Sequence, residues 1–316
     1  MPAGCEMNGP QACLPHADAG EFLILDVFAR RPFEGNQLAV FPSAAGLSTG
    51  QMQVIAREMH FSETTFILDA EPDAREFPVR IFTPAVEVPF AGHPTLGTAW
   101  VIWDRILKRG ADRVVLDLAV GTVPVEVHDA GDRLVMRQVP PEFGDACPAE
   151  QVATVLGLTR DDIDERFPCQ EVSTGIWFLI APVRTLDAVR RIKVNRAEYD
   201  RLVDRMRAKA VLVFCPETVS ADCHLHVRVF CDWYDVPEDP ATGSANGCLA
   251  AWLVRHRYLG TPDVELFTEQ GVELGRSSRL WLSARPEGER VSVRVGGRVV
   301  PVAEGRLLLR PDDDGI

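Results

Sequence analysis

The sequence has 316 residues, which is long for a single core and makes two domains the natural expectation. Hydrophobic residues make up 46% of the chain and charged residues 25%, so it can bury a substantial core and lacks the composition of a disordered protein. The formal net charge of -13 would repel nucleic acids, and no apolar run approaches the length of a membrane span. We therefore expect no nucleic-acid partner and no membrane association.

The cysteines and the N-terminal residues indicate the cellular compartment in which we expect the protein. The eight cysteines are scattered without a CxxC pair, and a chain of this size does not need disulfides for stability. We interpret them as reduced thiols of a cytoplasmic protein. Residues 1–20 have no basic start and no apolar run, so we expect an extension outside the fold and not a signal peptide.

A strand pair and a helix open the folded part. Residues 22–27 and 37–41 are predicted to form a hairpin around a turn that contains Pro and Gly. Ser48 and Gln51 form a capping box, and the apolar spacing that follows predicts a helix. A strand at 64–68 comes almost at once, which leaves Glu63 at the junction.

The rest of the first half alternates strands with one helix. The pattern predicts a strand at 79–83, a turn rich in Pro and Gly, a helix over 95–106, and a hairpin of 113–118 with 121–128. We expect residues 21–132 to form the first domain.

The second half repeats this order and is predicted as a second domain, 133–316. The tail is rich in hairpin signals, with turns expected at Glu287 and Gly288 and at Gly296 and Gly297. Its last strand can pack in either domain. The other predicted strands lie at 133–139, 172–181, 210–215 and 224–231, and the helices at 149–157, 185–192 and 244–256.

An internal repeat is the most informative feature of the sequence. VRIF at 79–82 and VRVF at 227–230 each lead through an acidic residue and Val-Pro to a glycine turn and a helix that carries Ala-Trp. One supersecondary unit therefore occurs twice, which indicates an internal duplication. We predict an α+β protein of two pseudo-equivalent domains, each with a mixed sheet packed on one main helix.

Both repeated turns place small residues at a helix start, Gly92 before His93 and Gly243 before Ser244. A helix start presents unpaired N–H groups and a positive dipole end, and glycine lets a ligand approach the backbone. Two such turns facing each other would hold one carboxylated molecule. The alternative is two well-capped helices, because Thr242 or Ser244 is a good N-cap without any ligand.

Three polar side chains near these turns are candidates for proton transfer. Glu63 is flanked by phenylalanines, and an apolar setting would raise its pKa; alternatively it is a solvated glutamate at a strand end. His93 can donate or relay a proton, or else cap its helix. Asp239 can orient this network or act as a second carboxylate, or else make a turn before Pro240.

Metal and nucleotide sites have little support. His224 and His226 alternate along a strand and share a face, but no third ligand stands at a convincing spacing. Cys248 lies inside a helix, where a small buried apolar role is expected. GxGxxG and GxxxxGK are absent from the sequence, so we expect no metal and no organic cofactor.

With these motifs the chain resembles the PhzF-like family of phenazine-biosynthesis isomerases, whose fold is similar to that of diaminopimelate epimerases. AGHPTLG and DPATGSA together are highly specific to the family. The matching segments span nearly all of residues 21–310: 26–41, 62–66, 80–100, 238–247, 269–278 and 295–309. The resemblance implies two domains, each a curved mixed sheet wrapped around a central helix, with an active site between them.

The resemblance also implies roles. Glu63 takes the place of the glutamate that shuttles a proton between carbons of a dihydro-hydroxyanthranilate. His93, Asp239 and Ser244 would form the polar shell around the substrate. Gly92 and Gly243 would give it backbone N–H groups, and Gln270 would line the cleft. The family implies a cofactor-independent, homodimeric enzyme with a small carboxylate substrate.

Two differences from relatives matter. Gln37 stands where proline usually follows Gly-Asn, away from the proposed chemistry. The epimerase relatives use one cysteine at each helix start, whereas these turns read AGHP and TGSA. A single glutamate predicts isomerisation by proton transfer and not inversion of a stereocentre. The alternatives are an amino-acid epimerase or dehydratase that uses other groups, and a non-catalytic binding protein on the same fold.

Overall fold

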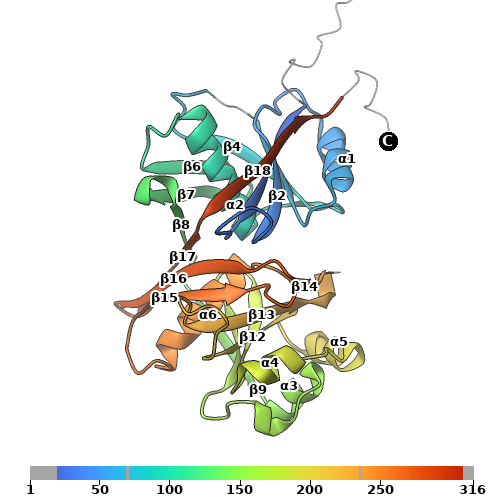
Figure 1. The fold of residues 1–316 in the computed structure, drawn as a ribbon, viewed down its shortest axis with the longest axis vertical. Helices are drawn as coiled ribbons and strands as arrows, with labels where there is room; N and C mark the ends of the chain where they lie inside the picture. The colour runs from blue at the N-terminus through green and yellow to red at the C-terminus, as the bar shows by residue number, and fades with distance from the viewer. Residues whose placement is uncertain (1–19, 69–70, 235, 309–316) are drawn as a thin grey trace, which may run out of the picture.

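The computed structural model of the protein describes residues 20–68, 71–234 and 236–308. Its elements form two lobes, one above the other in Figure 1. The N-terminal lobe contains β1 to β8 and the last strand, β18, and the C-terminal lobe contains β9 to β17. Apart from Gly20, the predicted extension 1–20 lies outside the described residues. The six described cysteines are all free.

The elements have the following bounds. The N-terminal lobe has β1 (Glu21–Val27), β2 (Asn36–Phe41), α1 (Thr49–Met59), β3 (Thr64–Ile67), β4 (Phe77–Phe82), β5 (Glu87–Val88), α2 (Gly92–Val101), the π-helix η1 (Ile102–Ile106), β6 (Arg113–Leu118), β7 (Gly121–His128), the 3-10 helix η2 (Asp129–Gly131), β8 (Arg133–Arg137) and β18 (Val299–Arg306). The C-terminal lobe has β9 (Glu142–Cys147), α3 (Ala149–Leu156), η3 (Arg160–Asp162), β10 (Cys169–Ser173), β11 (Trp177–Pro182), α4 (Leu186–Arg191), α5 (Arg196–Arg205), β12 (Ala210–Cys215), β13 (Leu225–Cys231), η4 (Asp232–Tyr234), β14 (Val236–Asp239), α6 (Gly243–Arg255), β15 (Val264–Gln270), β16 (Ser278–Glu287) and β17 (Arg290–Gly297).

The two lobes repeat one order of strand pairing. β1 to β4 pair in sequence as antiparallel, parallel and antiparallel, and β4 then pairs with β5 antiparallel and β6 parallel. β10 to β13 repeat this order, with β14 and β15 in the places of β5 and β6. The sheets therefore carry the duplication that the VRIF and VRVF segments indicate.

One helix forms the centre of each lobe. Every residue of α2 after Gly92 is buried, and so is nearly every residue of α6. A helix that is apolar all round must be surrounded, and each sheet curves about its own helix. Helix α1 instead begins with the predicted capping box, in which Ser48 and Gln51 exchange hydrogen bonds, and it packs by one face.

Two predicted elements are wrong, and several elements were not predicted. Residues 172–181 form two strands and not one, because the chain turns back at Gly175, whose φ is +120°. Strand β9 and helix α5 have no counterpart among the predictions. Gly296 and Gly297 do not turn a hairpin: β17 runs through them, and the next strand, β18, pairs with β1 in the other lobe.

The chain passes between the lobes at two places. β8 of the N-terminal lobe pairs with β17 of the C-terminal lobe, and the strand that follows each one joins the opposite lobe. The last strand thus lies in the N-terminal lobe, one of the two placements expected. The predicted division at residues 21–132 and 133–316 stays a proposal, and in the described structure both β8 and β18 lie with the N-terminal lobe.

Gly296 lies where β17 comes very close to β8, the pair of strands at which the chain passes between the lobes. A Cβ placed on Gly296 would lie 2.6 Å from the carbonyl oxygen of Leu134 and 2.8 Å from Cγ2 of Val135, both on β8. We expect Gly296→Ala to lower the free energy of unfolding by about 1–3 kcal/mol, because the backbone of β8 cannot move away from the added methyl group without disturbing its strand pairing. Gly50→Ala, at an open position of α1, should instead raise it by about 0.5–1 kcal/mol. Denaturant unfolding of both variants measures the difference, and equal stabilities would contradict this account of the passage.

Candidate active site

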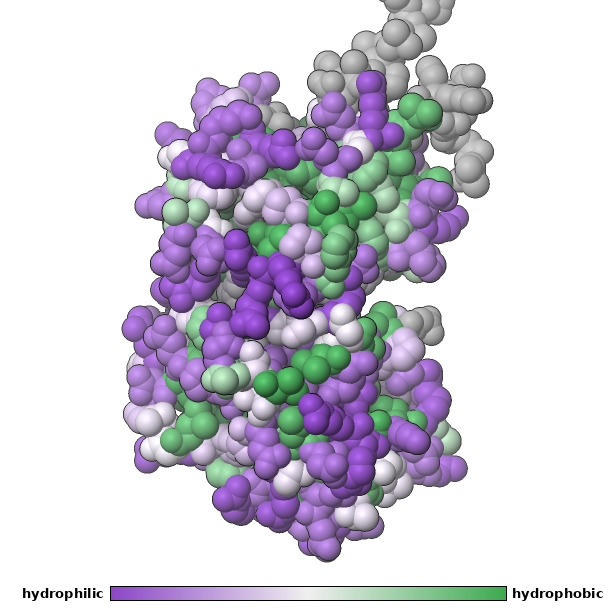
Figure 2. Space-filling view, in the orientation of Figure 1, coloured by the Kyte–Doolittle hydropathy of each residue, from purple (hydrophilic) through white to green (hydrophobic). Residues whose placement is uncertain are grey.

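The starts of α2 and α6 meet between the lobes. A Cβ placed on Gly92 would lie 3.6 Å from the backbone nitrogen of Ser244 and 3.9 Å from Cα of Gly243. The N-caps are Ala91 and Thr242, and neither side chain caps its helix. The capping alternative is therefore not realised, and two positive helix ends lie together. Figure 2 shows the surface hollowed between the lobes, on the side bordered by β14 and α1 in Figure 1.

Glu63 lies at this junction, in the short link between α1 and β3. Its side chain is 18% exposed, and its Oε2 atom is buried without a hydrogen-bond partner among the described residues. Burial raises its pKa to about 8, with a further contribution from the charge of Asp239, and a hydrogen bond from Ser62 opposes the shift. Glu63 is therefore mostly protonated at neutral pH, and the solvated alternative does not hold.

His93 faces Glu63 from the first turn of α2. Its Nε2 atom is 3.4 Å from Oε2 of Glu63 and 3.3 Å from the carbonyl oxygen of Gln37. Burial lowers its pKa to about 3, so the ring is neutral, and a carbonyl can only accept a hydrogen bond. The hydrogen therefore resides on Nε2 and is donated to the Gln37 carbonyl, with Oε2 of Glu63 close to the same nitrogen.

Asp239 ends β14 on the opposite lobe and joins the two lobes through Asn36. Its Oδ1 accepts a hydrogen bond from Nδ2 of Asn36 at 2.9 Å, and its Oδ2 accepts one from Thr242 at 2.5 Å. Burial raises its pKa, and these two hydrogen bonds oppose the shift. Asn36 also donates to the carbonyl of Ala241 at 3.1 Å, so it anchors β2 to the turn before α6.

Gln270 lies behind this turn and is fully buried. Its Nε2 donates to the Asp239 carbonyl at 2.7 Å and to Thr242 at 3.0 Å. Its Oε1 accepts from the Thr242 backbone at 3.1 Å and from Asn246 at 2.9 Å. All its polar atoms thus hold the turn in place. Direct contact between Gln270 and a substrate stays a prediction.

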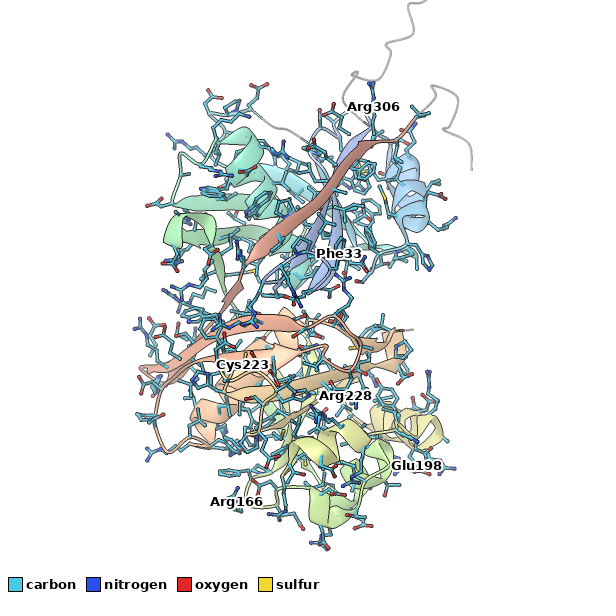
Figure 3. All side chains as sticks on the ribbon, viewed as in Figure 1. Phe33, Arg166, Glu198, Cys223, Arg228 and Arg306 are labelled. Carbon is cyan, nitrogen blue, oxygen red and sulfur yellow. The ribbon has the colours of Figure 1, made fainter. Side chains whose placement is uncertain are left out.

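Ser244 is partly exposed in the first turn of α6, where its carbonyl accepts a hydrogen bond from Thr174. The structure thus brings together all the predicted site residues, although their roles stay predictions. Asn36 was not among the predicted site residues, and Thr242 was considered only as a helix cap. The available signal for Asn36 was a polar side chain at the start of an apolar strand, directly after a glycine. Figure 3 shows the preceding loop, marked by Phe33, reaching toward the C-terminal lobe.

Comparison with known proteins identifies the family. The model of the phenazine biosynthesis-like protein family, PhzC-PhzF, matches residues 25–305. The chain belongs to this family. It is 36% identical over 293 residues to the trans-2,3-dihydro-3-hydroxyanthranilate isomerase of Pseudomonas aeruginosa, covering 91% of this chain and 99% of that enzyme. An uncharacterized isomerase of Mesorhizobium japonicum is 35% identical over 298 residues, with 91% and 98% covered. The protein is an enzyme, an isomerase of the PhzF type.

Solved structures agree on the fold. The phenazine biosynthesis protein of the PhzF family from Bacillus anthracis matches with a TM-score of 0.83 at 28% identity, covering 92% of this chain and 99% of that one. A hydroxyproline epimerase from Agrobacterium vitis matches at 0.59 and 13% identity, over 93% and 92% of the two chains, and is similar in fold alone. The predicted α+β, epimerase-like fold is confirmed.

The described residues contain no group of three or more His, Cys, Asp or Glu side chains suited to a metal ion. His226, a candidate ligand in the sequence, instead contacts two carboxylates. In the same part of the chain, no helix is long and apolar enough to cross a membrane.

The raised pKa of Glu63 makes stability depend on pH. Because its folded-state pKa of about 8 lies above the ordinary 4.5, the unfolded chain releases this proton at lower pH than the folded protein. Ionisation therefore costs the fold stability as pH rises through this interval. We expect Glu63→Gln to gain stability over the wild type between about pH 5 and about pH 9 in denaturant unfolding. The control is Glu58→Gln on the exposed face of α1, and a difference that does not change with pH would count against a buried Glu63.

Proposed function

We propose that the protein moves a proton within a small cyclic carboxylate resembling trans-2,3-dihydro-3-hydroxyanthranilate, with Glu63 as the only acid and base and without a cofactor. One observation carries the proposal: a buried carboxyl group with a pKa near 8 stands beside two uncapped helix starts. The named activity of the Pseudomonas aeruginosa relative supports the choice of substrate class.

The helix starts suit the substrate's carboxylate. The N–H groups at Gly92, Gly243 and Ser244 lie where two helix dipoles present partial positive charge, and no side chain caps them. An anion there would be held by backbone groups in fixed positions, whatever the net charge of the whole chain. The substrate ring would then lie toward Glu63 and His93.

The proton transfer needs one carboxyl group. Ionised Glu63 takes a proton from a C–H group made acidic by the adjacent unsaturated system, and the electron pair moves into that system. The carboxylic acid then returns the same proton to another carbon, so that a double bond shifts and no atom is gained or lost. A base with a pKa near 8 is stronger than an ordinary glutamate, which favours removal of a weakly acidic proton.

The neighbours of Glu63 are suited to supporting roles. His93 is neutral, its Nε2 donates to the Gln37 carbonyl, and it lies 3.4 Å from Oε2 of Glu63, so it can stabilise charge that develops beside the Glu63 carboxyl. Both Asp239 oxygens accept hydrogen bonds from Asn36 and Thr242, and its charge raises the pKa of Glu63. Neither helix start carries a thiol, which sets this site apart from a two-cysteine racemase.

We further propose that the enzyme is a homodimer of the cytoplasm, on the family resemblance. The six free cysteines of the described chain fit a reducing compartment.

Removing the acid and base tests the proposal directly. We expect Glu63→Gln to lower turnover of trans-2,3-dihydro-3-hydroxyanthranilate roughly a hundredfold to ten-thousandfold, because a general acid and base contributes about that factor. Binding of the aromatic analogue 3-hydroxyanthranilate, measured by calorimetry, should persist, and Glu58→Gln serves as the control. Unchanged turnover in Glu63→Gln would refute the mechanism. If the wild-type enzyme binds neither compound, the substrate class is wrong.

The pH dependence of the reaction follows from the base form of Glu63. We expect kcat/KM to rise with pH and to level off above about 8, because this ratio reports the ionisation of the free enzyme. In Asp239→Asn the rise should move to lower pH, because the charge of Asp239 raises the pKa of Glu63. A profile that levels off near the ordinary glutamate value in the wild type would contradict the assigned role.

A further inference from the structure

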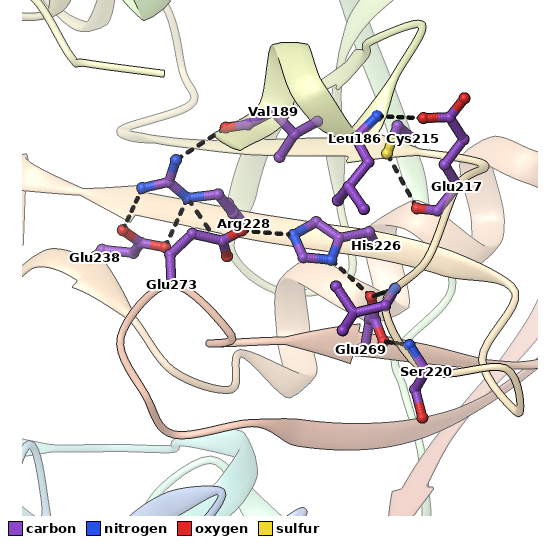
Figure 4. A network of polar contacts seen from close by, with 11 residues as sticks. Leu186, Val189, Cys215, Glu217, Ser220, His226, Arg228, Glu238, Glu269 and Glu273 are labelled. Carbon is purple, nitrogen blue, oxygen red and sulfur yellow. Dashed lines mark hydrogen bonds and ion pairs between the residues drawn. The ribbon is translucent and has the colours of Figure 1, made fainter. Parts of the chain in front are cut away.

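A buried charge network lies in the C-terminal lobe, outside the residues of the proposed mechanism. At its centre His226 of β13 is fully buried between two carboxylates, as Figure 4 shows. Its Nδ1 is 2.7 Å from Oε1 of Glu269, and its Nε2 is 3.1 Å from Oε1 of Glu273. In the sequence this histidine was a candidate metal ligand, whereas the structure places it between two carboxylates.

Both oxygens of Glu269 accept hydrogen bonds from the backbone. Besides His226, its Oε1 accepts a hydrogen bond from the Val219 backbone at 2.6 Å, and its Oε2 accepts one from the Ser220 backbone at 2.8 Å. A carboxylate that accepts several N–H bonds is held in its ionised form. The Nδ1 atom of His226 therefore carries a hydrogen.

Glu273 is the partner on the other ring nitrogen. Its Oε2 lies 3.9 Å from Nε of Arg228, which favours the ionised carboxylate and so places a hydrogen on Nε2 of His226 as well. Because a neutral imidazole has only one N–H donor, two ionised acceptors require the doubly protonated ring.

The same network supports the turn of the candidate site from behind. His226 and Glu269 are register partners in the parallel pair of β13 and β15, and the next residue of β15 is Gln270, which holds the 239–242 turn. Two residues along β13, the nearly buried Arg228 makes two hydrogen bonds to Glu238, at 2.9 and 2.7 Å, and Glu238 directly precedes Asp239. Figure 3 places Arg228 within the C-terminal lobe.

We propose that His226 is a buried cation that acts as a positioning residue: by binding Glu269 and Glu273 at once, it holds β13 and β15 together and fixes the turn that presents Asp239 to Glu63. The importance of Asp239 and Glu63 rests on the proposed function, whereas the charge of His226 does not.

The groups around His226 agree with a cation. Burial alone would lower the pKa of His226, but hydrogen bonds and charge from Glu269 and Glu273 outweigh it and raise the pKa. Burial raises the pKa of the Cys215 thiol on neighbouring β12 to about 12, so that group stays neutral. Arg228 is the other cation nearby, and Glu238 and Val189 already bind its guanidinium group.

The first test is the protonation state of His226 in the full chain, observed by NMR with 15N-labelled histidine. The signal is assigned by its absence in His226→Asn. Both ring nitrogens should carry hydrogens at neutral pH in the wild type. In Glu273→Gln the ring should lose its second hydrogen at lower pH than in the wild type. A neutral ring at neutral pH in the wild type would overturn the proposal.

The second test asks whether His226 positions the site, without using any substrate. The titration of Glu63 is followed by 13C NMR in the wild type, His226→Asn and the control His224→Asn, which changes the exposed histidine directly before β13. Release of the 239–242 turn should move the Glu63 pKa down from about 8 in His226→Asn, and His224→Asn should match the wild type. If His226→Asn does not fold, Glu273→Gln takes its place. An unchanged Glu63 titration would refute the positioning role, whereas an inactive wild type would count only against the proposed function.

Discussion

The meeting of two helix starts is the constraint on which the rest of the site depends. The first turns of α2 and α6 lie within contact distance of each other at Gly92, Gly243 and Ser244, and neither N-cap side chain caps its helix. Two partial positive charges are thereby brought together, an arrangement that an anion between them would relieve. The order of strand pairing is the same in both sheets. The central helix of each sheet therefore begins at the interface between the lobes, and the two helices reach it from opposite sides.

The two lobes share one order of strand pairing but differ in their charged side chains. Arg80 and Glu87 form a two-point ion pair in the N-terminal lobe, and Arg228 and Glu238 form its counterpart in the C-terminal lobe. The first pair is partly exposed, whereas the second is nearly buried and joins a larger charge network. One lobe thus contributes Glu63 and His93, and the other contributes Asp239 with a rigid support behind it. This asymmetry suits a single base better than two equivalent ones.

The sequence predicted those features that local patterns determine. The capping box at Ser48, both central helices and the repeated unit were visible because each depends on residues close together in the chain. Gly296 and Gly297 were predicted to turn a hairpin, because in the sequence a glycine pair at a close approach cannot be told from one in a turn. The atoms that they approach belong to Phe28 and Leu134, which are far away in the sequence. Asn36 was missed for the same reason, since its partner Asp239 lies in the other lobe. The role predicted for Gln270 came from family resemblance alone. For Glu63 the flanking phenylalanines indicated an apolar setting, but only the resemblance favoured it over a solvated glutamate.

Burial acts on Glu63 and His93 in opposite directions, and this difference decides which of them can carry a proton. Removal from water disfavours the charged form of each group, so it raises the pKa of the carboxyl to about 8 and lowers that of the imidazole to about 3. Near neutral pH, Glu63 exists in both protonation states, whereas His93 has no accessible cationic form. Of these two groups, Glu63 is therefore the one that can exchange a proton near neutral pH, whereas the imidazole stays neutral. In the proposed reaction, the low polarity around Glu63 and His93 would favour a substrate whose charge lies away from them, toward the helix starts.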